Sequence, residues 1–134
     1  MTRIEFYSNR FLPYLPESCQ VNPGAYGFEL ALWLSNALMQ LDIVTSYPMG
    51  EDWGWFIEYG EGEAEFMIGC GSNADEGEGY LGQPVLWSVF VQQALSLKQR
   101  LRGQSALVIA AKLMDAIVAV LQADGIAVQI EKAT

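Results

Sequence analysis

Apolar and polar positions alternate along several short stretches of the chain, at the spacing of a β-strand with one buried face. Other short apolar runs are bounded by Gly, Pro or acidic turn residues, which is also typical of strands. Together these patterns predict about six strands, at residues 3–7, 43–47, 53–59, 64–70, 84–91 and 126–130.

Two longer segments carry apolar residues at three- and four-residue steps, as helices with one buried side do. The first covers about residues 25–41, where Asn22 is suited to cap the helix and Pro23 to its first turn. The second covers about residues 105–123, and Gly125 supplies its stop. We therefore expect two main helices.

The order of these elements is β-α-β-β-β-β-α-β, with several strands in succession. Such an order favours an antiparallel or mixed sheet over a parallel one, because parallel pairs need a crossover between consecutive strands. The sequence predicts a single α+β domain over residues 1–134, with a sheet of about five to six strands and both helices on one face.

The stretches 53–59 and 64–70 form a predicted hairpin around Gly60–Glu63. A four-residue loop pairs Tyr59 with Ala64, Ile57 with Phe66, Trp55 with Ile68 and Trp53 with Cys70, which makes one face of the hairpin wholly apolar. With the broad apolar surface of the first helix, this predicts a core that includes Trp33, Trp53, Trp55, Ile57, Phe66 and Ile68.

The same register places Glu58 opposite Glu65 on the other face of the hairpin. Like charges that oppose each other across a strand pair destabilise it. A nearby cation, protonation of one carboxylate or a basic partner would relieve the repulsion. The alternative is that both residues belong to a solvated face with no further role.

The charge of the chain is strongly negative and unevenly distributed. Its formal net charge is −9, with 16 Asp and Glu against 7 Lys and Arg. No basic residue occurs between Arg10 and Lys98, and a short basic stretch follows at Lys98, Arg100 and Arg102. A negative field repels phosphate backbones, so a basic protein is a better candidate partner than nucleic acid. The charge could equally serve solubility alone.

The residue types needed for the familiar catalytic and metal sites are scarce. There is no histidine, and the two cysteines, Cys19 and Cys70, cannot form a disulfide framework or a four-ligand zinc site. The glycine-rich residues 69–72 have no base to activate Cys70 or Ser72, and the acidic residues 75–78 lack EF-hand spacing. We expect a non-enzymatic protein with no cofactor and no metal.

Neither a signal peptide nor a run of about 20 apolar residues is evident in the sequence. This indicates a cytoplasmic protein with reduced thiols and no membrane contact.

A Tyr-Pro turn at Tyr47–Pro48, the motif Glu51-Asp52-Trp53-Gly54-Trp55 and the strand end Ile68-Gly69-Cys70-Gly71 stand in succession. In these motifs the chain resembles a family of small uncharacterised bacterial proteins, over roughly residues 24–130. The resemblance implies the same order of elements and carries no assigned chemistry.

These observations predict a protein-binding domain with an immunity-like or inhibitor role against a basic protein. The residues expected to contact the partner are Glu58, Glu65, Glu51, Asp52, Asp75, Glu76 and Glu78. The alternative is a ligand-binding module or small enzyme with Glu58, Glu65 or Asp52 as acid-base group in a pocket between the first helix and the sheet. A third interpretation is a homodimer joined through surplus apolar helix surface.

Overall fold

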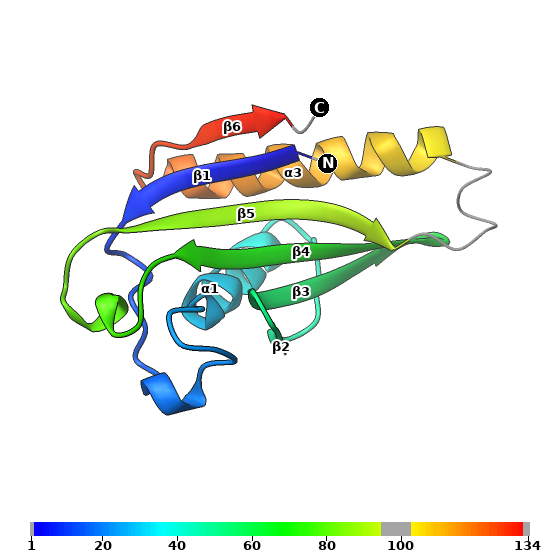
Figure 1. Ribbon diagram of the computed structural model, residues 1–134. Helices are drawn as coiled ribbons and strands as arrows, with labels where there is room; N and C mark the ends of the chain where they lie inside the picture. Colours follow the sequence, from blue (N-terminus) through cyan, green and yellow to red (C-terminus); the bar gives the residue numbers. More distant parts are fainter. Residues whose placement is uncertain (1, 95–102, 133–134) are drawn as a thin grey trace.

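The computed structural model describes residues 2–94 and 103–132 (Figure 1). Within these residues the chain forms a single six-stranded antiparallel sheet and two main helices, so the predicted α+β fold and order of elements are confirmed. The strands are β1 (Thr2–Ser8), β2 (Met49–Glu51), β3 (Gly54–Glu61), β4 (Ala64–Asn73), β5 (Val85–Ala94) and β6 (Gln129–Lys132). The helices are α1 (Phe28–Met39) and α3 (Gly103–Ala123), with short 3-10 turns η1 (Glu17–Cys19) and η2 (Glu78–Tyr80).

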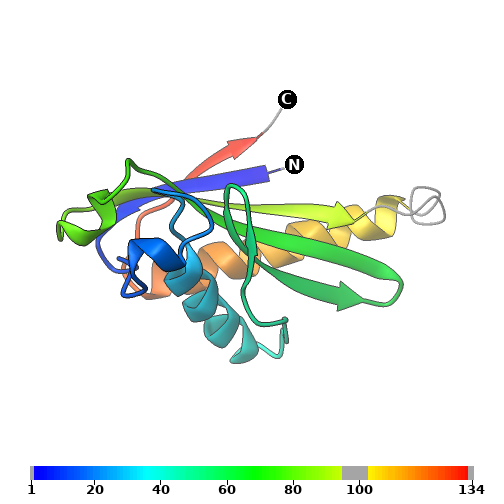
Figure 2. The same ribbon diagram turned by 60° about the horizontal axis from the view of Figure 1, so that its bottom comes forward.

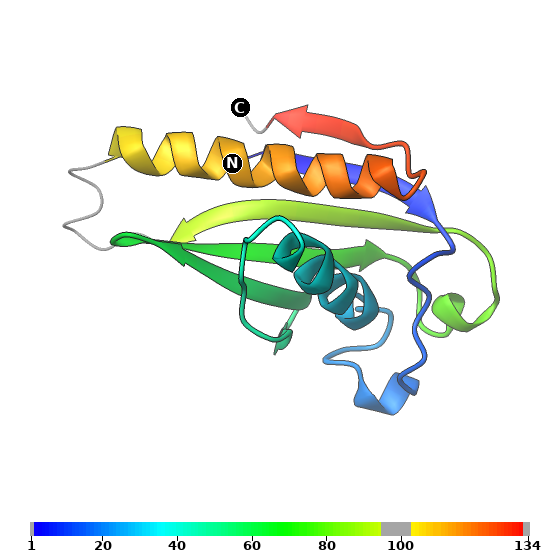
Figure 3. The ribbon, with the colours of Figure 1, turned by 180° about the vertical axis from the view of Figure 1, so that it is seen from behind.

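The strands lie side by side in the order β2-β3-β4-β5-β1-β6. Strands β2 to β5 follow one another in the chain and are neighbours in the sheet. Strand β5 also pairs with β1, the first strand of the chain, and β6 pairs with the other edge of β1. Both helices cover the same face of the sheet, as the views from below and from behind show (Figures 2 and 3). We call this the inner face, and the opposite side of the sheet the outer face.

The alternation of side chains along β5 explains why the inner face of the sheet packs against the helices. Its residues Val85, Trp87, Val89 and Val91 are buried, and the residues between them point to the outer face. Helix α1 packs against β3 and β4, α3 packs against β5, and the two helices contact each other. The core therefore lies between the inner face and the helices.

The β3–β4 hairpin differs from the predicted register by two residues. The strands reach Glu61 and resume at Ala64, so the turn consists only of Gly62 and Glu63. Gly62 has φ +62°, the positive value that tight hairpin turns favour. Trp55 consequently pairs with Cys70, and Ile57 with Ile68. Because the shift is an even number of residues, the apolar side chains stay on the inner face.

Two other predicted boundaries are wrong. The first helix begins at Phe28, and Asn22 does not cap it; the Asn22 side chain donates to the backbone carbonyl of Asp52 at 2.7 Å. The stretch 43–47 is not a strand, and β2 lies further on. Ser46 nevertheless lies beside β3, because its backbone N–H donates to the backbone carbonyl of Glu58 at 2.9 Å.

Residues 106–123 of α3 are long and apolar enough to span a bilayer by length and composition, with mean hydropathy 1.9. From its sequence the chain was not expected to contain such a segment. In the structure 28% of this segment is buried, including Leu113, Ile117 and Leu121 in the core. Core helices pass the same test of length and composition, so this finding alone places no part of the chain in a membrane. The predicted basic stretch at Lys98, Arg100 and Arg102 lies outside the described residues.

Candidate functional site

The outer face of the sheet is the most distinctive surface of the described residues. Along each strand the side chains alternate between the two faces, so those between the buried core positions of β4 and β5 emerge here. Several side chains on this face are large and apolar yet only partly covered: Met49 of β2, Phe56 of β3, Met67, Leu86 and Phe90 are half-buried, and Tyr7 of β1 is exposed. Half-exposed aromatic and methionine side chains on one surface are typical of binding sites.

One row of residues crosses the middle of this face. Phe56 pairs with Gly69, Gly69 with Phe90, and Phe90 with Arg3. The ring of Phe90 occupies the space where a side chain at Gly69 would stand, since a Cβ there would lie 2.2 Å from the ring. Glycine at this position therefore allows Phe90 to lie flat over β4.

Trp53 and Arg3 extend this aromatic surface on either side of Phe90. The rings of Trp53 and Phe90 have centroids 5.0 Å apart at an interplanar angle of 54°. The guanidinium carbon of Arg3 lies 6.0 Å from the Phe90 ring centroid, within reach of a cation–π contact.

The adjacent row consists of small residues. Gly54 pairs with Gly71, Gly71 with Ser88, and Ser88 with Glu5. This row forms the floor of a shallow hollow of about 400 Å³ beside the aromatic surface. The hollow is lined by Arg3, Glu5, Trp53, Gly71, Ser72, Asn73, Leu86, Ser88 and Phe90. The outer face thus combines an aromatic wall, a small-residue floor and a few polar groups.

Trp53 is placed differently from the prediction. It lies in the turn between β2 and β3, and its side chain is 37% exposed on the outer face. The alternation of β3 begins only at Gly54, so extending it back to Trp53 gave the wrong face. The other residues expected in the core lie on the inner side: Ile57, Phe66 and Ile68 are buried, and Trp33 and Trp55 are partly buried against the core.

The predicted opposition of Glu58 and Glu65 is wrong. Glu58 pairs with Met67, and Glu65 pairs with Gly60. The shorter hairpin turn moves the two carboxylates into diagonal positions, whose separation is about 7–8 Å in antiparallel sheets. Both remain exposed on the outer face. They therefore do not reach a space between α1 and the sheet, which the acid-base alternative needed.

The remaining predicted contact residues lie toward the other end of the sheet. Glu51 and Asp52 are exposed at the β2–β3 turn beside Trp53. Asp75, Glu76 and Glu78 belong to the loop that follows β4, where Glu78 accepts a hydrogen bond from the backbone N–H of Asp75 at 2.8 Å. The structure therefore divides the predicted residues into two acidic groups, one toward each end of the strands, with the aromatic row between them.

Two further carboxylates are used inside the fold. Glu29 of α1 is buried, and its Oε2 accepts hydrogen bonds from the backbone N–H groups of Tyr14 and Leu15, both at 3.3 Å. Burial raises the pKa of Glu29 above its usual value. Glu17 Oε1 accepts from the Tyr26 hydroxyl and from the backbone N–H of Gly77. These contacts hold the irregular residues 11–27 against the loop after β4.

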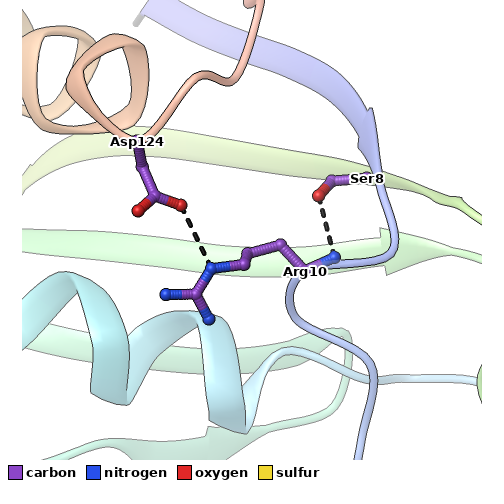
Figure 4. A network of polar contacts seen from close by, with 3 residues as sticks. All are labelled: Ser8, Arg10 and Asp124. Carbon is purple, nitrogen blue, oxygen red and sulfur yellow. Dashed lines mark hydrogen bonds and ion pairs between the residues drawn. The ribbon is translucent and has the colours of Figure 1, made fainter.

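One cation has a clear structural role at the same end of the sheet. Arg10 Nε lies 3.1 Å from Asp124 Oδ2, and the Arg10 backbone N–H donates to Ser8 Oγ at 2.9 Å (Figure 4). The pair ties the segment after β1 to the end of α3. Arg10 is thus engaged away from the outer-face carboxylates.

The two cysteines differ in their surroundings, since Cys19 is exposed and Cys70 lies in the core. Cys70 is completely buried, and burial raises the pKa of its thiol so that it stays protonated. Within residues 2–94 and 103–132, no three Cys, Asp or Glu side chains converge as a metal ion would require.

Comparisons with protein-family models, curated proteins and solved structures gave no match. The functional interpretation therefore depends on the geometry and charge of the outer face. Sequence reasoning missed Arg3, Ser88 and Phe90 as parts of this surface. The sequence signal that could have indicated this surface is the presence of two glycines, Gly69 and Gly71, two residues apart in one strand. Glycine in a strand interior often marks a close approach by another group.

Proposed function

We propose that this protein is a non-enzymatic binding domain that holds a basic protein partner on its outer face. The observation that carries the proposal is the combination of half-exposed aromatic and methionine side chains with exposed carboxylates on and beside that face. Large, partly rigid aromatic residues supply most of the binding energy in protein interfaces, and a charged rim selects and steers the partner.

Electrostatics favour a cationic partner over other macromolecules. The net charge of −9 attracts basic surfaces and repels nucleic acid. Glu58 and Glu65 lie on one side of the aromatic row, toward the β3–β4 turn, and Glu51 and Asp52 lie on its other side, toward the β2–β3 turn. A partner that covers the row would therefore meet carboxylates on both sides. An immunity-like or inhibitor protein that neutralises a basic enzyme is the most concrete form of this function.

The proposal is tested by affinity capture from a lysate of the source cells with the wild type, two outer-face variants and one control variant. The variants are Glu58→Gln with Glu65→Gln, which removes two outer-face charges, and Trp53→Ala, which removes the exposed indole. A matched control, Asp115→Asn, removes an exposed charge from α3 on the other side of the molecule.

We expect a basic protein that is retained by the wild type and the control and is reduced several-fold by either outer-face variant. Raising the salt concentration should weaken capture further, because exposed charges are screened. Equal capture by all forms, or no basic protein in any capture, would contradict the proposal.

A further inference from the structure

The hollow beside Trp53 has a shape and chemistry that restrict what it can hold. Its volume of about 400 Å³ is at the lower end of the range for small-ligand sites, about 300–1,000 Å³, and suits a single extended group. At the bottom of the hollow Gly71 has no side chain and Ser88 has a small one. The indole of Trp53 forms one wall and is partly exposed to solvent. A flat group could therefore lie against the indole without displacing another side chain.

The polar groups of the hollow are mainly hydrogen-bond acceptors or groups that can accept. Asn73 offers an amide oxygen and Ser88 a hydroxyl oxygen. A ligand rich in N–H donors complements such a set.

The aromatic surface is already suited to a guanidinium. Arg3 places its own guanidinium over one region of the Phe90 ring, at 6.0 Å from the centroid. Indole binds cations better than any other aromatic side chain, and a planar guanidinium also stacks on aromatic faces, which an ammonium cannot do.

Charge decides between cationic and anionic occupants. Arg3 is the one cation among the residues that line the described hollow, and the exposed carboxylates Glu51 and Asp52 stand beside Trp53 in the chain. With a net charge of −9 in addition, the surroundings disfavour an anion.

We infer that the hollow accepts an arginine side chain of the partner, with the guanidinium against the indole of Trp53 and its N–H groups directed to the side-chain oxygens of Asn73 and Ser88. This inference rests on the proposed function and names the residue type that the outer face recognises. An arginine in a central aromatic hollow is the kind of anchor that dominates binding energy in interfaces.

The test uses small probes and the purified full chain, so it does not need the partner. N-acetyl-arginine amide, N-acetyl-lysine amide and N-acetyl-glutamate amide are titrated separately while the indole N–H signals are followed by NMR. Trp55 is an internal control, because its indole N–H donates to Gln20 Oε1 on the inner side of the sheet at 3.3 Å.

We expect a saturable shift of the Trp53 signal with the arginine probe, at least several-fold weaker binding of the lysine probe and no saturable shift with the glutamate probe. Ser88→Leu, which fills the floor, should abolish the shift. An unchanged Trp55 signal in that variant shows that the fold is intact. A Trp53→Leu variant, followed through the backbone N–H signal of Ser88, gives a second test.

No saturable shift with arginine, equal binding of lysine or glutamate, or equal shifts of Trp53 and Trp55 would overturn the inference. Failure here is distinguishable from failure of the proposed function. If Ser88→Leu still captures the basic partner as the wild type does, then the outer face binds the partner without the hollow.

Discussion

Glu29 shows how a single carboxylate can make folding depend on pH. Its side chain is 7% exposed, and burial raises its pKa above the unfolded value of about 4.5. The folded state therefore holds the proton more tightly than the unfolded state. This contribution to stability is fully present below pH 4.5 and is lost as the pH rises toward the raised folded pKa.

We predict that Glu29→Gln removes this part of the pH dependence, since a neutral amide has no proton to lose. Relative to the wild type, the free energy of unfolding of the variant should increase between pH 4.5 and neutrality. Urea unfolding followed by tryptophan fluorescence at several pH values measures it. The control Glu76→Gln changes an exposed loop residue and should follow the wild-type profile. Parallel profiles for Glu29→Gln and wild type would contradict the account.

Gly69 and Gly71 provide a matched pair on the outer face of β4. A Cβ at Gly69 would lie within 2.8 Å of three Phe90 ring atoms, whereas at Gly71 the nearest atom is 3.4 Å away. We predict that Gly69→Ala displaces the ring and costs about 1–3 kcal/mol of stability, as overpacking does. Gly71→Ala should change stability by about 0.5 kcal/mol or less. Thermal or urea unfolding of both variants measures this, and equal losses would show that Phe90 does not lie over Gly69.

At the scale of elements, the hairpin turn fixes the register of β3 and β4. Gly62 has φ +62°, a backbone conformation that disfavours side chains. We predict that Gly62→Ala lowers the free energy of unfolding by about 1–2 kcal/mol. Gly60→Ala is the control, because Gly60 lies in the strand and a Cβ there would meet its nearest atom at 3.8 Å. A loss at Gly60 as large as that at Gly62 would refute this account of the turn.

The elements themselves could be predicted from the sequence because hydrophobic periodicity reports burial directly. The alternation in β3 and β4 assigned Ile57, Phe66 and Ile68 to one face, and they are buried there. Periodicity does not determine turn length, however, and loops of two or four residues give the same faces. The opposition of Glu58 and Glu65 depended on that length, and so it failed.

The candidate site was only partly predictable for a related reason. It is formed by residues on four strands, and their neighbours across the sheet follow from the strand order. Arg3 and Phe90 are far apart in the sequence, and they pair only because β5 lies beside the first strand, β1. Trp53 lies just before a strand, where alternation no longer assigns a face. The acidic residues could be identified from the sequence, whereas the aromatic row between them required the fold.

At the scale of the whole molecule, the two sides of the sheet differ in what covers them. Helices α1 and α3 cover the inner face and form the core with it, while the outer face retains half-exposed aromatic side chains beside carboxylates. The core therefore lies on one side of the sheet, and the other side leaves aromatic and acidic side chains partly open to solvent. The proposed binding function depends on this separation.

Site-specific photo-cross-linking tests this claim most directly. A photoreactive phenylalanine analogue replaces Phe56 on the outer face, and in a second protein it replaces Leu107, which is 70% exposed on α3. Both proteins are irradiated in a lysate of the source cells. We predict that position 56 cross-links to a basic protein, that Glu58→Gln with Glu65→Gln reduces this product, and that position 107 gives no such product. Cross-linking to the same protein from position 107 alone, or only to a second copy of the chain, would contradict the outer face as the binding surface.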